Sequence, residues 1–117
     1  MARPALAEGK QAPVVEEFLG KWHKSVVDEV AAAVARDHLV VVGMAQNPFV
    51  KKARKLLDAR GTKYTYLEYG SYLGKWKERL AIKLWAGFPT FPMVFLDGVL
   101  QGGYAELEGL ERAGTLN

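Results

Sequence analysis

The sequence predicts an α/β domain in which a mixed four-stranded sheet carries helices on both faces. Segments with apolar residues every three or four positions alternate with short runs rich in β-branched and aromatic residues. The resulting order is helix, strand, helix, strand, helix, strand, strand, helix. The last two strands flank Asp97-Gly98, a strong signal for a two-residue hairpin. A parallel βαβ half followed by a hairpin and a helix gives a mixed sheet.

The length of the chain limits the number of domains. It has 117 residues, 50% of them apolar, which suits one compact domain and is too short for two. We expect a flexible arm over residues 1–13, a single domain over 14–113 and a frayed tail over 114–117. Within the domain, residues 14–36 are an added helix and residues 38–112 are the core.

The N-terminal half predicts a helix, a strand and a second helix. One amphipathic helix spans residues 14–36, because apolar side chains recur there at helical spacing. They are Val15, Phe18, Leu19, Trp22, Val26, Val30 and Val34. Residues 38–42 are too apolar to alternate, which is typical of a strand buried on both faces. Asn47 is a favoured N-cap and Pro48 a favoured first helical residue, so the next helix starts at Pro48 and ends at Gly61.

The C-terminal half predicts the remaining elements. Residues 63–68 alternate as a strand does, and residues 69–74 form a glycine-bounded loop. Residues 75–85 form a helix. Its predicted inner face consists of Trp76, Leu80 and Leu84. The hairpin strands are Met93–Leu96 and Val99–Gln101. A last helix carries Leu107 and Leu110 on its inner side.

Composition excludes several classes of function. The absence of cysteine excludes disulfides and cysteine-ligated zinc or iron–sulfur sites within this chain. The net charge is only +3, and the one dense basic run fits a solvated helix face, so no nucleic-acid partner is expected. That run is Lys51, Lys52, Arg54 and Lys55. His23 and His38 lack further ligands at metal spacing, so no metal site is predicted. No apolar run approaches the roughly 20 residues of a membrane span, so we expect no membrane partner and a cytoplasmic location.

The segment Gly87-Phe-Pro-Thr-Phe-Pro-Met-Val-Phe-Leu-Asp-Gly98, followed by Gly102-Gly103, resembles the glutaredoxin family. The resemblance covers about residues 38 to 112 and is closest to the monothiol branch. It implies a thioredoxin-like fold, here with an extra N-terminal helix. Phe88 stands where monothiol members have tryptophan, and Tyr104-Ala105 stands where they have Cys-Asp.

The four active-site positions of the family correspond to Asn47, Pro48, Phe49 and Val50. Family members have Cys-Pro-Tyr-Cys or Cys-Gly-Phe-Ser there, so the proline and the aromatic remain while both sulfur positions are lost. An asparagine amide cannot form a mixed disulfide. We therefore expect no catalytic residue, and we interpret Asn47 as a structural N-cap that stabilises the helix by roughly 1 kcal/mol.

The resemblance also implies remnants of a glutathione or peptide cleft. The positions concerned are Arg79, Lys83, Thr90, Phe91, Pro92, Gly102, Gly103 and Tyr104. Pro92 matches the family's cis-proline. Two anchors are replaced, by Met44 and Ala105, so we expect no bound cofactor and glutathione affinity of about millimolar or weaker. The alternative interpretation of Arg79 and Lys83 is a solvated helix face.

Three functions remain open. The first is a non-catalytic binding or adaptor module that holds a protein partner in the cleft or on the added helix. Tyr69 and Tyr72 favour it, because aromatics in a glycine loop suit an interface. A homodimer through the N-terminal helix would use Phe18 and Trp22 as anchors. The second is a weak, non-covalent glutathione-binding protein. The third, implied by family alone, is glutathione-dependent disulfide reduction or iron–sulfur carriage, which requires the missing cysteine.

Overall fold

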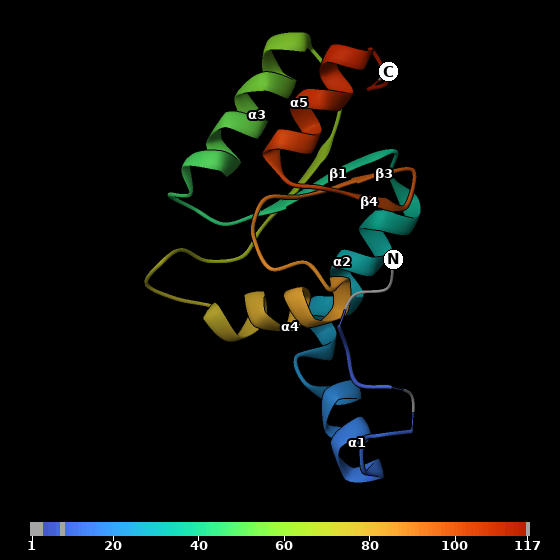
Figure 1. Ribbon diagram of the computed structural model, residues 1–117. Helices are drawn as coiled ribbons and strands as arrows, with labels where there is room; N and C mark the ends of the chain where they lie inside the picture. Colours follow the sequence, from blue (N-terminus) through green and yellow to red (C-terminus); the bar gives the residue numbers. More distant parts are fainter. Residues whose placement is uncertain (1–3, 8, 117) are drawn as a thin grey trace.

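Nine helices and strands follow one another in the computed structural model of the chain, which describes residues 4–7 and 9–116 (Figure 1). The helices are α1 (Pro13–Lys21), α2 (Lys24–Arg36), α3 (Pro48–Arg60), α4 (Trp76–Ala86) and α5 (Tyr104–Ala113). The strands are β1 (Leu39–Gly43), β2 (Thr65–Glu68), β3 (Met93–Leu96) and β4 (Val99–Gly102). Among the described residues, no helix has both the length and the apolar character to cross a bilayer.

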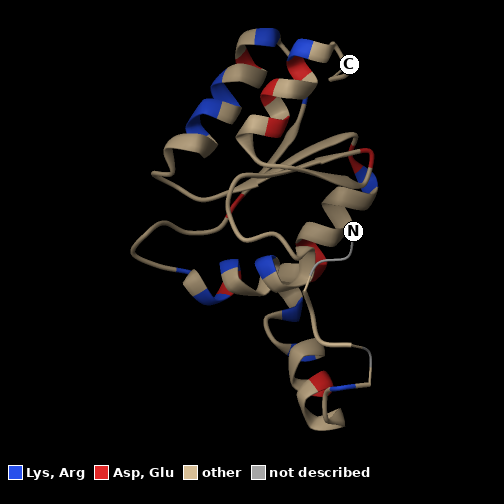
Figure 2. Cartoon of the chain, in the orientation of Figure 1, with Lys and Arg blue, Asp and Glu red and all other residues tan. Residues whose placement is uncertain are grey.

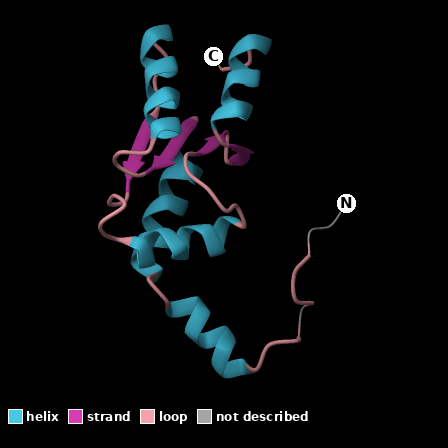
Figure 3. Cartoon of the chain, turned by 60° about the vertical axis from the view of Figure 1, so that its left-hand side comes forward, coloured by secondary structure: helices cyan, strands magenta, loops and turns pink. Residues whose placement is uncertain are grey.

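The sheet has the order β2-β1-β3-β4 and confirms the predicted mixed topology. Strand β1 pairs parallel with β2 and antiparallel with β3, so Val41 faces both Tyr66 and Val94 across the ladders. Asp97 and Gly98 turn β3 into β4 with φ angles of 50° and 81°, the positive values that a tight hairpin turn requires. Helices α3 and α5 cover one face of the sheet, and α2 and α4 cover the other (Figures 1 and 3).

The core consists of two apolar clusters, one on each face of the sheet. Successive residues of a strand point to opposite faces, so β1 contributes Val40 and Val42 to one cluster and Leu39 and Val41 to the other. All five residues of β1 are buried, as expected for a central strand covered on both sides.

The prediction of one continuous helix over residues 14–36 is wrong. Helix α1 ends at Lys21 and α2 begins at Lys24. Between them Trp22 is extended and His23 has the left-handed φ of 48°. The apolar repeat continues through this break, so periodicity alone did not reveal it. Residues 4–7 and 9–12 of the predicted arm lack regular structure, and residues 1–3 and 8 of that arm lie outside the described residues.

The C-terminal tail is not frayed as predicted, because Leu116 is buried. Gly114 has the left-handed φ of 72° and turns the chain back at the end of α5. The backbone N–H of Thr115 then donates to the Leu110 carbonyl. This is the glycine C-cap geometry that brings a following apolar residue against the helix. The side chain of Leu116 is 1% exposed and joins the cluster beneath α3 and α5. Asn117 lies outside the described residues.

Helix α4 buries a different face from the predicted one. Trp76, Leu80 and Leu84 are all exposed. The buried residues are Ala81, Ile82 and, unexpectedly, Arg79. Apolar residues occur on more than one side of this helix, and packing of Ile82 in the cluster with α2 determines which side faces inward. The predicted inner face is therefore left as an exposed apolar stripe.

Candidate functional site

A groove of about 550 Å³ lies where the starts of α3 and α5 meet the 88–92 segment and the end of α4. It brings together most residues that the sequence assigned to a cleft. Those that line it are Asn47, Pro48, Phe49, Lys83, Thr90, Phe91, Pro92, Gly103 and Tyr104. Three assigned residues do not line it, namely Val50, Arg79 and Gly102. Met44, which stands at a replaced anchor, also lines the groove, and so do Tyr72 and Glu106, which the sequence did not assign to it.

Asn47 closes the N-terminus of α3 as a side-chain cap, as predicted. Its backbone is extended, and Oδ1 accepts hydrogen bonds from the backbone N–H groups of Phe49 (2.9 Å) and Val50 (3.1 Å). Pro48 follows at the first helical position, where the lack of an N–H costs nothing. The polar end of α3 is thus satisfied internally at the place where the resemblance put a nucleophile.

Val50, at the second sulfur position, points into the core instead of the groove. It is 2% exposed and packs in the cluster between the sheet and α2. A Cβ added to Gly43 of β1 would lie 2.7 Å from Val50 Cγ1, so the start of α3 lies very close to the end of β1. This close packing makes Val50 a structural residue.

The mouth of the groove is aromatic. Phe49 is 53% exposed, and its ring centroid lies 6.4 Å from that of Tyr104. Partial desolvation, together with the neighbouring carboxylate of Glu108, raises the pKa of the Tyr104 hydroxyl. Tyr104 therefore stays a neutral phenol at physiological pH, with the Glu108 carboxylate as an acceptor for its single O–H.

The floor of the groove is the Phe91-Pro92 segment, whose peptide bond is cis. Phe91 is buried, and Lys83 Nζ lies 5.6 Å from the centroid of its ring. This distance allows a cation–π contact. A Cβ added to Gly103 would lie 3.4 Å from the carbonyl oxygen of Pro92, so the start of α5 packs directly on this segment. Lys83 thus places an ammonium group beside an apolar floor.

Arg79 is 8% exposed, which rules out the predicted alternative of a solvated helix face. Its Nη1 donates to the carbonyl oxygens of Tyr69 (3.1 Å) and Gly74 (2.6 Å). The guanidinium therefore braces the loop between β2 and α4 from within. Sequence spacing indicated that Arg79 and Lys83 share one helix face, but only Lys83 reaches the groove.

Gly102 and Glu106 form an internal cap at the start of α5. Gly102 is buried with a φ of 125°, and a Cβ there would lie 2.3 Å from Glu106 Oε1. The same oxygen accepts from the backbone N–H of Gly103 at 2.9 Å. The Gly103 N–H is thus already bonded to a carboxylate of the protein. Glu106 lies next to Ala105, the position where the resemblance implied an acidic residue that binds an amine.

The two tyrosines of the loop between β2 and α4 have different environments. Tyr72 is exposed at the edge of the groove, which fits the predicted interface role. Tyr69, by contrast, is buried, and its hydroxyl donates to the Glu29 carboxylate of α2. Burial, followed by this carboxylate, raises the pKa of Tyr69. Because its side chain is buried, the predicted interface role is wrong for Tyr69.

The groove therefore offers an ammonium group, hydroxyls and apolar surface, with no thiol. The whole chain lacks cysteine. Over the described residues, no group of three histidine, aspartate or glutamate side chains is close enough to hold a metal ion. The arrangement suits reversible binding of a ligand that carries an apolar part and a negative charge.

Removing the cap at Asn47 tests how this end of the groove is held. Asn47→Ala should lower the free energy of unfolding by about 1 kcal/mol, because the N–H groups of Phe49 and Val50 lose their acceptor. Urea denaturation followed by circular dichroism measures the change. Asn47→Ser, which keeps a side-chain acceptor, should lose much less. Equal losses in the two variants would contradict the cap assignment.

Known proteins with similar sequences are named as glutaredoxins or as glutaredoxin-like. No family model matches the chain. The chain is 46% identical over 94 residues to a glutaredoxin-like protein of Dictyostelium discoideum, covering 80% of this chain and 76% of that protein. It is 32% identical over 79 residues to glutaredoxin 1 of Rickettsia felis, covering 68% and 76% respectively.

Solved structures with a similar fold include two of buckwheat glutaredoxin. A mutated form aligns with a TM-score of 0.70 and 27% identity, covering 86% of this chain and 88% of that chain. A glutaredoxin–glutathione complex aligns with a TM-score of 0.68 and 24% identity, covering 82% and 87%. These neighbours share the thioredoxin-like arrangement of sheet and helices described above.

Proposed function

The chain belongs to the glutaredoxin family, and we propose that it is a non-catalytic member that holds a peptide segment of a protein partner in the groove. The observation that carries this proposal is that Asn47 acts as a structural N-cap of α3. Its side chain caps α3 where a thiolate would be needed, while the aromatic mouth and the Phe91-Pro92 floor of the groove remain. Thiol–disulfide exchange needs a sulfur nucleophile, which no residue of this chain supplies.

The chemistry of the groove supports a peptide with two features. Phe49, Tyr72 and Tyr104 give it an aromatic rim, and aromatic residues are enriched where proteins bind one another. Lys83 supplies a positive charge over the apolar floor. We therefore expect a partner segment that pairs an apolar side chain with a nearby carboxylate.

Glutathione is the second candidate ligand, because Lys83 lines the groove as the resemblance implied. Other contacts argue for weak binding. Arg79 is committed to two backbone carbonyls, and Glu106 already occupies the N–H of Gly103. In addition, Met44 and Ala105 replace two charged anchors of the cleft. The loss of two charge-assisted contacts weakens binding by about two to four orders of magnitude, so we expect dissociation constants in the millimolar range or above.

Panning a displayed library of random twelve-residue peptides against the protein tests the peptide proposal. Enriched sequences should combine an acidic with an apolar residue. Their affinity should fall about tenfold or more in Lys83→Met, which removes the charge at the groove. Lys77→Met is the matched control, because Lys77 lies on the same helix, is exposed and does not line the groove.

Two results would count against the proposal. One is a library from which no sequence is enriched, and the other is equal weakening by the Lys83 and Lys77 variants. Titration with reduced and oxidised glutathione to about 10 mM, read from amide shifts at residues 90–92 and 103–104, separates the two candidates. Saturating shifts there without peptide enrichment would favour the glutathione reading. Partners held elsewhere, including a second copy of the chain, would leave these amides unchanged.

A further inference from the structure

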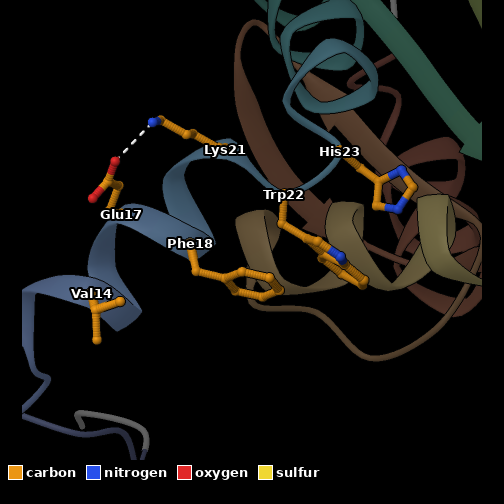
Figure 4. A pocket seen from close by; sticks show the side chains of 6 residues that line it. All are labelled: Val14, Glu17, Phe18, Lys21, Trp22 and His23. Carbon is orange, nitrogen blue, oxygen red and sulfur yellow. Dashed lines mark hydrogen bonds and ion pairs between the residues drawn. The ribbon is translucent and has the colours of Figure 1, made fainter.

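Helix α3 carries three lysines that no carboxylate neutralises. Lys51, Lys52 and Lys55, here called the lysine row, are exposed. Over residues 4–7 and 9–116 none of them forms an ion pair with an aspartate or glutamate. Lys21 of α1, by contrast, donates to Glu17 at 2.8 Å beside an open hollow on that helix (Figure 4). The lysine row therefore concentrates positive charge in a way that the paired charges of α1 do not.

The acidic residues near the lysine row have other partners. Figure 2 shows acidic residues along α5, which lies with α3 on one face of the sheet. Each acidic residue of these two helices already interacts with another group. The pairs are Glu106 with the N–H of Gly103, Glu108 with the Tyr104 hydroxyl, Glu111 with Arg60, and Asp58 with the Tyr64 hydroxyl. Neither helix thus supplies a free carboxylate to the lysine row.

The lysine row is unfavourable for α3 itself. Lys51 and Lys55 are four residues apart, and like charges at this spacing repel one another across one helical turn. All three lysines lie in the first two turns of a helix that has no acidic residue in its first turn. Positive charge at this end of a helix also opposes the helix dipole. A bound anionic group would relieve both effects.

The lysine row begins at the mouth of the groove. Lys52 Nζ lies 5.4 Å from the centroid of the Phe49 ring, and Phe49 lines the groove. Lys51 and Lys55 border a common hollow on the outer side of α3. From Phe49 to Lys55 the helix advances by six residues, which is about 9 Å at 1.5 Å per residue. An extended peptide covers this distance with about three residues.

We propose that the partner segment held in the groove continues along α3 and places acidic side chains against the lysine row. This inference rests on the proposed binding of a peptide in the groove and adds a second element of specificity. The acidic residues lie about three positions beyond the apolar residue at Phe49. A polypeptide is favoured over other polyanions, because the groove suits an apolar side chain and the adjoining lysine row suits carboxylates.

Extended versions of a peptide enriched by panning on the wild type test this inference. Four glutamates or four glutamines are added at each end in turn, and fluorescence anisotropy in about 50 mM salt, where screening is weak, gives the affinities. At one end the glutamates should lower the dissociation constant about fivefold or more relative to the glutamines. Lys51→Met together with Lys55→Met should abolish this difference and leave the affinity of the unextended peptide unchanged. Lys52 is kept, because it contacts Phe49 at the groove.

Lys63→Met together with Lys77→Met is the matched control. Both of these lysines are exposed and lie outside α3 and the groove. Each double variant removes two positive charges from the net +3 of the chain, so the control accounts for non-specific attraction. The control should keep the full effect of the glutamates, and so should Lys51→Arg together with Lys55→Arg. Circular dichroism checks that all variants stay folded.

Several results would overturn the inference. One is a glutamate extension without effect at either end, and another is an effect that both methionine double variants lose equally or both keep. Binding of a twelve-nucleotide DNA or of phosphatidylglycerol vesicles that requires Lys51 and Lys55, without any effect of the glutamates, would assign the lysine row to that partner instead. If the glutamates have no effect while Lys83→Met still weakens the unextended peptide, the groove binds peptides and only the extension along α3 is wrong. A library without enriched peptides would overturn both proposals.

Discussion

Asn47→Cys is expected to turn the start of α3 into a reactive thiolate site. The asparagine oxygen now accepts from two backbone N–H groups at 2.9 and 3.1 Å. A cysteine sulfur at the same N-cap would receive those N–H groups and the positive end of the helix dipole. Both favour the thiolate, so the pKa of the new thiol should fall from about 8.5 to below about 7.5.

The pH dependence of alkylation by iodoacetamide measures that pKa directly, because the chain has no other cysteine. Ser71→Cys is a matched control, since Ser71 lies in the loop between β2 and α4 and not at a helix start. Its alkylation rate should reach half of its plateau near pH 8.5. If the two thiols titrate alike, the start of α3 does not stabilise a thiolate. The wild-type protein should give no glutathione-dependent disulfide reduction above background.

The sheet and the cap at α3 could be predicted because local rules determine them. Residues 38–42 are uniformly apolar, and only a strand covered on both faces suits such a run. Asn47-Pro48 carries its own helix-start chemistry, and Asp97-Gly98 its own turn chemistry. These signals depend on neighbours in sequence, so tertiary packing did not overrule them.

The orientation of α4 and the role of Arg79 could not be predicted, because both depend on contacts distant in sequence. Trp76, Leu80 and Leu84 have the right spacing for a buried face, yet packing with α2 buries Ile82 instead. With Ile82 on the inner side of α4, Arg79 also points inward and donates to two carbonyl oxygens of the loop between β2 and α4. This loop is irregular, so no sequence pattern predicts the contact. A cationic residue on a helix is usually solvated, so composition favoured the wrong interpretation.

Arg79→Met is expected to lower the free energy of unfolding by roughly 3 kcal/mol. The variant keeps an apolar stem of similar length but removes both guanidinium hydrogen bonds, so the Tyr69 carbonyl loses its donor while the Gly74 carbonyl keeps only the backbone N–H of Ser71. A buried acceptor that loses its partner, as the Tyr69 carbonyl does, costs about 1 to 3 kcal/mol, and the lost hydrogen bond to the Gly74 carbonyl adds about 1 kcal/mol. Gly70 has little room to adjust, since an added Cβ would lie 2.4 Å from the Gly74 oxygen. The loop is thus closely packed around the guanidinium.

The loop braced by Arg79 also carries Tyr72 to the groove, so the same variant should weaken peptide binding even well below its unfolding midpoint. Urea denaturation gives the stability, and fluorescence anisotropy with a peptide selected on the wild type gives the affinity. Lys83→Met is the control that separates the two effects. It should weaken binding with a stability change within about 0.5 kcal/mol, because Lys83 lines the groove and its ammonium lies over the Phe91 ring instead of bracing the loop. An Arg79→Met protein as stable as the wild type would show that the loop holds its shape without the brace.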